Sequence, residues 1–565
     1  MYYRIHEIKV RIGEDRSLIP QKILKKLRAG GGWRIGDFRV ARSSVDARDK
    51  SDIRFVYAVD FAFDNADGTG LIEKAKRRGV RVEPAPDDRY VIPEVFVVCT
   101  EPPPEKREGR MDAHMAENEK TRNEHMSDAI IPAGKRPVII GFGPCGIFAA
   151  YVLARAGLRP IAFERGKPVD ERALDVAAYW QTGELNENSN VLFGEGGAGA
   201  FSDGKLTTGI GDVRKAFVLE TLAGAGGGAG LPADARPHIG TDVLRGVVKK
   251  LREEIISLGG EIRFSTKFTA FDTDANNAIC RVHCELSSGD TESIDTSAVI
   301  LATGHSARDT YEALLCQGVS FTPKPFSVGV RIEHSQKLIN DAMYGADFEK
   351  LYGMTASEAG LPPAEYKLSS KCLDGRGVYT FCMCPGGEVV AAASERGGVT
   401  SNGMSNNARS GEYANSAVLV DVRVDDFESA HPLAGVEFQR RWERAAYSIK
   451  DSLLPSETLG EFMGENSILA ACLPDFAVRD IREALPAFGK RIEGFDMPSA
   501  KLYGPETRSS SPVRIPRGKT MQAAVAGLYP CGEGAGYAGG IMSAAIDGIK
   551  AAEQIIAVFK DAGNS

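Results

Sequence analysis

The chain has 565 residues, of which 43% are hydrophobic and 26% are charged, and its formal net charge is −7. This length exceeds what one hydrophobic core usually supports, and the composition favours a globular protein of two or three domains over a disordered or fibrous one. The chain starts without an apolar signal core, and no apolar run approaches the roughly 18–20 residues of a spanning helix. We therefore expect a cytoplasmic protein that does not insert into a membrane.

The first part of the chain, residues 1–97, is predicted to form a small α+β domain. Alternating apolar residues predict strands over 3–10, 33–40 and 52–63, and helical spacing predicts a helix over 18–27. Residues 1–50 carry 13 Lys and Arg against 6 Asp and Glu. Such an excess can bind nucleic acid or an acidic protein, although a solvated charged face is its commoner origin.

The segment 98–135 is rich in charge and proline and lacks apolar periodicity, which predicts a linker or a mobile insertion. Beyond it the pattern is α/β over 136–319, mixed strand and helix over 320–497, and α/β again over 498–565. The middle region lies between two glycine-rich segments that both look like ligand contacts. We therefore expect it to be an inserted substrate or cap domain over one split domain. The Ala/Gly tract 223–230 is predicted to be a flexible loop.

A dinucleotide-binding pattern follows the predicted linker. An apolar strand over 138–140 runs into Gly141, Gly143 and Gly146, an apolar helix follows, and a second strand ends at Glu164, 23 residues after Gly141. The three glycines suit a tight turn, close approach to a diphosphate, and close packing of helix on strand, and the helix N-terminus faces the phosphates. Glu164 is placed to accept hydrogen bonds from ribose hydroxyls. An ordinary glycine-rich turn would not explain an acid at this spacing.

Three further segments favour FAD over NAD. The stretch 193–207 is a second glycine-rich loop with hydroxyl groups and Lys205, suited to wrap a flavin and its diphosphate. The stretch 298–304 is an apolar strand that ends in Thr-Gly, and 527–552 supplies a strand, a Gly-Glu pair and a helix start, so that Glu533 can bind a ribityl hydroxyl. Each segment alone can be a structural loop. Together they recur in the order expected of one nucleotide held by a split domain.

At these residues the chain resembles a bacterial family of uncharacterised FAD-dependent dehydrogenases, the NAD/FAD-utilising dehydrogenases, within the glutathione-reductase-like FAD superfamily. The resemblance lies in 190–208, 237–242, 380–395, 400–405, 506–515 and 530–549, and in 43–57 of the N-terminal domain. It implies an α/β fold in which a split Rossmann-type FAD-binding domain carries an inserted α+β substrate domain and a small N-terminal α+β domain. It implies no particular substrate. One departure is Cys145, where the fingerprint commonly has alanine; a small thiol should fit there.

From the motifs and the resemblance together, the predicted cofactor-binding residues are Gly141, Gly143, Cys145, Gly146, Glu164, Arg165, Gly196, Gly197, Ser202, Asp203, Gly204, Lys205, Thr207, Thr303, Gly304, Gly532, Glu533, Gly536, Gly540 and Ile541.

The ten cysteines show no paired metal-type spacing, so we predict reduced, mostly buried thiols and no metal site. Cys382 and Cys384 are one residue apart, and on a strand they would point to the same face. They are interpreted either as a redox pair or soft-metal site, or as buried thiols beside a glycine turn. Cys531 adjoins the last predicted cofactor segment, but the paired cysteines of disulfide reductases are absent there.

Other polar residues have two interpretations each, and none is assigned as catalytic. His305 and His238 can donate protons or can be hydrogen-bonded structural residues. Arg508, Arg514 and Arg517 can clamp an anionic substrate or can neutralise the cofactor's phosphates.

These observations predict an FAD-dependent oxidoreductase that acts on an unidentified small-molecule substrate by hydride transfer at flavin N5. A second complete strand-glycine-helix unit is absent from the sequence, so NADH or NADPH would dock only transiently. The alternative is a flavin-containing protein that binds RNA or a partner through its basic N-terminal domain. The lack of interleaved aromatic and basic residues disfavours nucleic acid, whereas a protein electron partner stays open.

Overall fold

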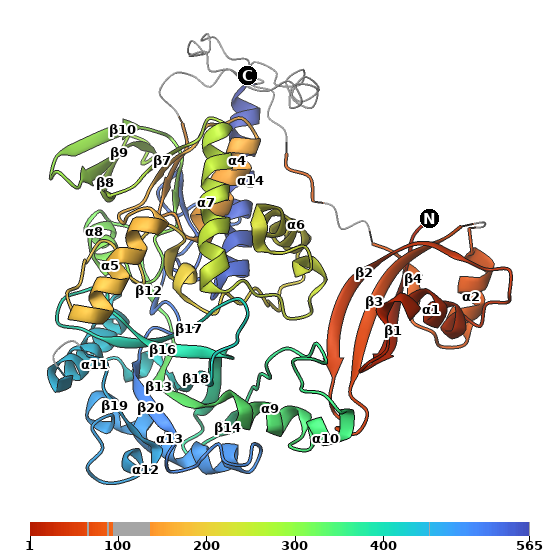
Figure 1. Cartoon of the computed structure of the whole chain (residues 1–565). Helices are drawn as coiled ribbons and strands as arrows, with labels where there is room; N and C mark the ends of the chain where they lie inside the picture. The colour runs from red at the N-terminus through yellow and green to blue at the C-terminus, as the bar shows by residue number, and fades with distance from the viewer. Residues whose placement is uncertain (65–66, 87–89, 94–135, 451–452, 564–565) are drawn as a thin grey trace.

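A computed structural model of the chain describes residues 1–64, 67–86, 90–93, 136–450 and 453–563 (Figure 1). The predicted linker 98–135 lies outside these residues. Three larger sheets organise the rest: a four-stranded N-terminal sheet, a five-stranded parallel sheet and a six-stranded antiparallel sheet. Among the described residues, no helix combines the length and the apolar character needed to cross a membrane.

The N-terminal region is a β-α-β-β-α-β unit whose strands lie in the order β2-β3-β1-β4. Alternate residues of β1 and β3, such as Ile5 and Phe61, are buried against the two helices, which lie on one face of the sheet (Figure 1). The elements are β1 (Tyr3–Arg11), α1 (Ile19–Leu27), β2 (Ile35–Asp46), β3 (Arg54–Phe63), α2 (Thr69–Arg77) and β4 (Val82–Pro84).

The parallel sheet has the order β22-β11-β5-β6-β7, and β22 reaches it from the end of the chain. Its strands β5, β6, β11 and β22 are buried on both faces, as apolar runs without alternation predict, whereas the edge strand β7 is partly exposed. On one face they pack against α4, α7 and α14, which lie side by side in Figure 1, and on the other against the sheet β10-β9-β8. The predicted α/β class, a Rossmann-type sheet with additional domains, is confirmed.

The elements of this part are β5 (Val138–Ile140), α4 (Pro144–Arg155), β6 (Ile161–Phe163), α5 (Val169–Thr182), α6 (Arg214–Leu222), α7 (Thr241–Ser257), β7 (Glu261–Arg263), β8 (Thr266–Thr273), β9 (Ile279–Leu286), β10 (Thr291–Asp295), β11 (Val299–Leu301), α8 (Arg308–Cys316), β22 (Leu528–Pro530) and α14 (Ile541–Gly563).

Between β11 and β22 the chain forms the antiparallel sheet β14-β15-β18-β13-β20-β19, called the inserted sheet below, and a separate hairpin of β16 and β17. The elements are β12 (Thr322–Pro323), β13 (Phe326–Ser335), α9 (Gln336–Tyr344), α10 (Phe348–Tyr352), β14 (Ser369–Lys371), β15 (Gly377–Cys384), β16 (Gly387–Ala392), β17 (Thr400–Ser405), β18 (Tyr413–Val422), α11 (Ala434–Lys450), β19 (Ser456–Thr458), α12 (Leu459–Phe462), α13 (Asp475–Gly489), β20 (Lys501–Glu506) and β21 (Val513–Arg514). The core of this sheet is continuous with that of the N-terminal region.

The predicted flexible loop over 223–230 is wrong for its first part. Residues Ala223–Gly227 form a π-helical turn that continues α6, with Gly226 at φ 108°. Ala225 is buried, and a Cβ on Gly227 would lie 2.7 Å from the side chain of Ile239. Small residues therefore serve close packing here rather than flexibility.

Candidate cofactor site

A cavity lies at the carboxyl ends of β5, β6 and β11, the edge at which open α/β sheets bind their ligands. The space between its walls measures about 1600 Å³ when the part open to solvent is included. Its lining comes from the residues after these strands, from the first turns of α4 and α14, from the glycine-rich loop 192–205 and from the inserted sheet. Because the first turn of a helix leaves its N–H groups without intrahelical acceptors, both helix starts favour a negative charge in the cavity.

The three glycines of the dinucleotide-binding pattern, Gly141, Gly143 and Gly146 (the fingerprint turn), occupy their positions for different structural reasons. Gly141 has φ 98°, and a Cβ on it would lie 2.5 Å from the carbonyl oxygen of Ala302. A Cβ on Gly146 would lie 1.9 Å from the carbonyl oxygen of Gly141, so this residue allows α4 to pack closely on the turn. Gly143 lines the cavity, and a Cβ there would meet only ordinary contacts, the nearest at 3.5 Å. The protein's own packing therefore does not explain Gly143, whereas a ligand close to the backbone would.

Glu164 lies at the end of β6 and is 5% exposed. Its Oε2 accepts a hydrogen bond from the backbone N–H of Phe142 at 2.8 Å, and its Oε1 accepts from Gly166 and Gly194, both at 3.0 Å. A carboxylate offers about four acceptor positions, so one remains on Oε2 for a hydroxyl of a bound ligand. The carboxylate also fixes both glycine-rich loops to each other.

The second glycine-rich loop is held from behind by Arg172 of α5, a residue that the sequence motifs did not reveal. Its side chain is fully buried and donates to the carbonyl oxygens of Asn190, Val191, Gly194, Glu195 and Gly197 at 2.7–3.3 Å. Burial lowers the pKa of Arg172 to about 9, although the negative charge of Glu164 acts to raise it. Arg172 therefore remains cationic at neutral pH and fixes the loop that lines the cavity.

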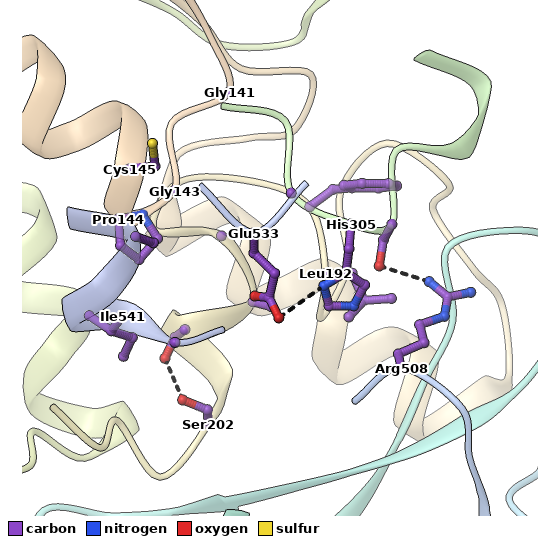
Figure 2. Close-up of a pocket in the computed structure, with 18 of the residues that line it drawn as sticks. Gly141, Gly143, Pro144, Cys145, Leu192, Ser202, His305, Arg508, Glu533 and Ile541 are labelled. Carbon is purple, nitrogen blue, oxygen red and sulfur yellow. Dashed lines mark hydrogen bonds and ion pairs between the residues drawn. The ribbon is translucent and has the colours of Figure 1, made fainter. Parts of the chain in front are cut away.

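The loop after β11 meets the loop before α14 at the cavity wall. His305 Nδ1 lies 3.5 Å from Glu533 Oε1, and Figure 2 shows these two side chains turned toward each other. His305 Nε2 is buried and has no hydrogen-bond partner in the described structure. The hydroxyl of Tyr311 donates to the carbonyl oxygen of Gly534 at 2.7 Å and lies 3.2 Å from that of Gly304, so it connects the two loops.

The inserted sheet contributes a polar wall with a buried ion pair. Arg331 of β13 donates to both carboxylate oxygens of Glu506, at 3.0 and 2.7 Å, and both residues line the cavity. Phe381, Cys382 and Cys384 of β15 line the same wall. The sequence motifs give no role to Arg331 or Glu506, because these residues are brought together only by the pairing of β13 with β20.

Arg508 lines the cavity and belongs to a buried charge network. Its guanidinium donates to Glu443 at 2.9 and 2.7 Å and to the hydroxyls of Ser306 and Ser394 at 3.0 and 2.7 Å. Arg308 donates to the same carboxylate at 2.8 and 2.9 Å. Burial alone would raise the pKa of Glu443, but Arg308 and Arg508 hold it well below its usual range. The guanidinium of Arg508 thus makes these hydrogen bonds to protein groups.

The structure brings most of the predicted cofactor residues together. Fifteen line the cavity: Gly141, Gly143, Cys145, Glu164, Arg165, Gly197, Ser202, Asp203, Gly204, Lys205, Thr303, Gly304, Glu533, Gly540 and Ile541. Five do not: Gly146, Gly196, Thr207, Gly532 and Gly536. Of these five, Thr207 is exposed on the surface, and Gly532 donates its N–H to Asp547 at 2.8 Å. Two of the cavity-lining charges are engaged within the protein, since Arg165 pairs with Asp309 at 2.9 Å and Asp203 with Arg409.

Four other candidates lie outside the cavity lining. Arg517 pairs with Asp547 at 2.7 Å, and Arg514 lies over the ring of Tyr537. His238 Nε2 lies 3.1 Å from the carbonyl oxygen of Asn407, and Cys531 is fully buried beside Cys145. The nine cysteines within the described residues are free thiols, and six of them are buried.

Comparison with known proteins identifies the family. A model described as "FAD-dependent protein, C-terminal domain-like" matches residues 325–509, and a domain of unknown function (DUF8436) matches residues 2–62. An uncharacterised protein from Clostridium beijerinckii is 40% identical over 582 residues, which cover 99% of each chain. The chain belongs to the family of this protein. The description of the first model supports FAD as the cofactor.

Solved structures with similar folds are remote. They include OxyS anhydrotetracycline hydroxylase from Streptomyces rimosus, 13% identical over 75% of this chain and 62% of that chain, with a TM-score of 0.33. The flavin-dependent brominase Bmp2 is 13% identical over 76% and 83% of the two chains, with a TM-score of 0.36. A 3-ketosteroid-delta4-(5alpha)-dehydrogenase from Rhodococcus jostii is 12% identical over 74% and 95%, with a TM-score of 0.32. Scores this low assign no substrate.

Proposed function

We propose that the protein is an FAD-dependent oxidoreductase of the glutathione-reductase-like superfamily, located in the cytoplasm, that oxidises or reduces a small-molecule substrate by hydride transfer at flavin N5. The observation that carries the proposal is the convergence of four distant segments on one cavity: the fingerprint turn, the loop 192–205, the residues after β11 and the start of α14. The family model of an FAD-dependent protein supports the choice of cofactor.

The residues of the cavity fit this cofactor. Gly143, Gly539 and Gly540 line the cavity, and a Cβ on any of them would lie at least 3.5 Å from all protein atoms outside its chain neighbours. Glycines that the protein's own packing does not require are expected where a backbone must approach a ligand closely. The starts of α4 and α14 both favour the negative diphosphate.

In this proposal the fingerprint turn and the start of α4 hold the diphosphate, and Glu164 accepts a hydrogen bond from the adenosine ribose. Glu533, at the start of the last segment, accepts one from the ribityl chain. FAD supplies the hydride chemistry when bound. The protein binds and orients the cofactor and the substrate and excludes water from them. Residues of the inserted sheet face the substrate. NADH or NADPH docks only transiently as an electron donor, because the sequence contains no second nucleotide-binding unit that would hold it.

Glu164 provides the test of cofactor binding. Glu164→Gln should weaken FAD binding about 10-fold or more, because hydrogen bonds to an ionised acceptor are lost in a buried site. The exposed Glu171 of α5 gives the matched control Glu171→Gln, which should leave binding unchanged. Flavin released from each denatured protein is quantified, and affinity is measured by titrating each apoprotein with FAD. Wild-type protein that cannot be loaded with FAD contradicts the proposal.

The electron donor is tested separately by anaerobic titration of the loaded protein with NADH and then NADPH. Bleaching of the flavin band supports a nicotinamide-linked enzyme. A flavin that stays oxidised with both excludes the nicotinamide step and directs the search to substrates that the flavin oxidises.

A further inference from the structure

Two thiols lie on the inserted-sheet wall of the cavity. Cys382 and Cys384 both line the space that is lined elsewhere by Gly143, Lys205 and Glu533. Cys382 is exposed, whereas Cys384 is 1% exposed. Neither the proposed binding of FAD nor the hydride transfer uses these residues.

A β-bulge brings both thiols to this wall. Phe381 of β15 pairs with Ala417 of β18, and Cys384 pairs with Asn415, so Cys382 and Met383 together oppose one residue of β18. In a regular strand Phe381 and Cys382 would point to opposite faces. With the bulge, Phe381, Cys382 and Cys384 all line the cavity, while Met383 is buried in the core of the inserted sheet. Bulges commonly redirect side chains beside active sites.

The bulge is fixed by cations on both sides. Cys382 has φ 43°, a left-handed conformation that is uncommon for a residue with a side chain. Arg331 Nη1 donates to the carbonyl oxygen of Cys382 at 3.2 Å, and Lys205 Nζ donates to that of Met383. The thiol of Cys384 donates to the carbonyl oxygen of Cys382 at 3.2 Å, which places it back over the Cys382 peptide. Both cysteines therefore line one wall, and the Cys384 thiol lies against the backbone of Cys382.

We propose that Cys382 and Cys384 form a dithiol–disulfide pair that exchanges two electrons with FAD held in this cavity. This inference rests on the proposed function. In the forward direction both S–H bonds break and one S–S bond forms. The two electrons and two protons released reduce the isoalloxazine from FAD to FADH2, so the step needs no other oxidant. In reverse, a flavin reduced by the donor returns the pair to two thiols.

The protonation of the thiols is compatible with this exchange. Cys382 faces the cavity, where the surrounding protein atoms desolvate its thiolate and raise its pKa to about 11; burial raises the pKa of Cys384 to about 12, and Arg331 and Lys205 oppose both shifts. At neutral pH the reduced pair therefore consists of neutral thiols, which release their protons together with the electrons.

The first test counts electrons in the FAD-loaded protein. Anaerobic titration of fully oxidised wild-type protein with dithionite should consume two two-electron equivalents per flavin, one for the flavin and one for the disulfide. Cys382→Ser and Cys384→Ser should each consume one. Cys531→Ser is the matched control, because Cys531 is buried beside Cys145 on the nucleotide-binding side and should not alter the wild-type uptake.

The second test needs no flavin readout. Oxidised protein is alkylated, digested and mapped by mass spectrometry, and the peptide that holds both residues should carry an internal disulfide. After reduction both thiols should be alkylated. If the serine variants do not fold, the wild-type titration and the peptide map decide alone.

The outcomes separate this inference from the proposed function. A fully loaded wild-type protein that consumes one equivalent and carries no disulfide at these residues overturns the inference and leaves the function intact. If the second two-electron equivalent persists in Cys382→Ser but disappears in Cys531→Ser, this uptake belongs to Cys145 and Cys531. That result also overturns the inference. A protein that binds no FAD contradicts the proposed function itself.

Discussion

The buried guanidinium of Arg172 donates its hydrogen bonds to five backbone carbonyl groups of the second glycine-rich loop rather than to a carboxylate. Hydrogen bonds that involve a charged group contribute about 1.5–3 kcal/mol each, and a lysine cannot reproduce this fork of donors. Arg172→Gln should therefore weaken FAD binding by about 10-fold or more and lower the melting temperature, with Arg172→Lys only partly better. Fluorescence titration of the apoproteins with FAD measures the first effect, and calorimetry the second.

Lys249→Gln is the control for Arg172. Lys249 pairs at 3.0 Å with Asp170 on the exposed side of the same region, and surface pairs contribute about 0–1 kcal/mol. Wild-type affinity for FAD in a folded Arg172→Gln protein would show that the loop keeps its shape without this side chain.

Three elements meet at Glu443 of α11, where Arg308 at the start of α8 and Arg508 after β20 share one buried carboxylate. Loss of one partner from a buried pair costs about 3–5 kcal/mol, so Glu443→Gln should lower the free energy of unfolding by that amount at neutral pH. Glu437→Gln, at an exposed position of the same helix, should change it little.

The effect of Glu443 should depend on pH with a definite sign. Its pKa in the folded protein is lowered, so its contribution to stability is complete above the unfolded value of about 4.3 and is lost as pH falls through the folded value. The difference in unfolding free energy between wild type and Glu443→Gln should therefore be constant above about pH 5 and shrink in more acidic buffer. Denaturant titrations across this range measure it, and a difference that grows on acidification would contradict the assignment.

Local periodicity was sufficient to predict individual elements. The strands predicted over 3–10 and 138–140 and the helix over 18–27 correspond to β1, β5 and α1. The glycine motifs were sufficient to predict residues that line the cavity, because each motif carries its own turn. The bulge of β15 was not predictable, since it depends on which residue of β18 lies opposite. The roles of Arg172 and Glu443 were not predictable either, because their hydrogen-bond partners are distant in sequence.

At the scale of the whole molecule, the N-terminal sheet can be compared with sheets that bind RNA, which is the alternative function considered for the basic N-terminal domain. Sheets that bind single-stranded RNA stack bases on aromatic side chains of their open face. Here Phe55, Tyr57 and Phe61 of β3 are buried, and they pack in the cluster that also contains the helices α1 and α2. No residue of this sheet lines the cavity. The described structure thus brings no residue of the basic segment into the lining of the cofactor site.

The cavity joins the parallel sheet to the inserted sheet, so removal of FAD should loosen both regions together. A ligand that binds only the folded state stabilises it by about 2.7 kcal/mol at 100 times its dissociation constant. Wild-type protein in such an excess of FAD should unfold with a free energy higher by this amount than the apoprotein. Hydrogen exchange should become faster without FAD in the loop 192–205 and in β15, and should stay unchanged in β1 and β3, which serve as the internal control. Protection of β1 and β3 equal to that of the cavity segments would show that FAD stabilises the chain as one cooperative unit, whereas protection confined to the loop would show that the inserted sheet does not close on the cofactor.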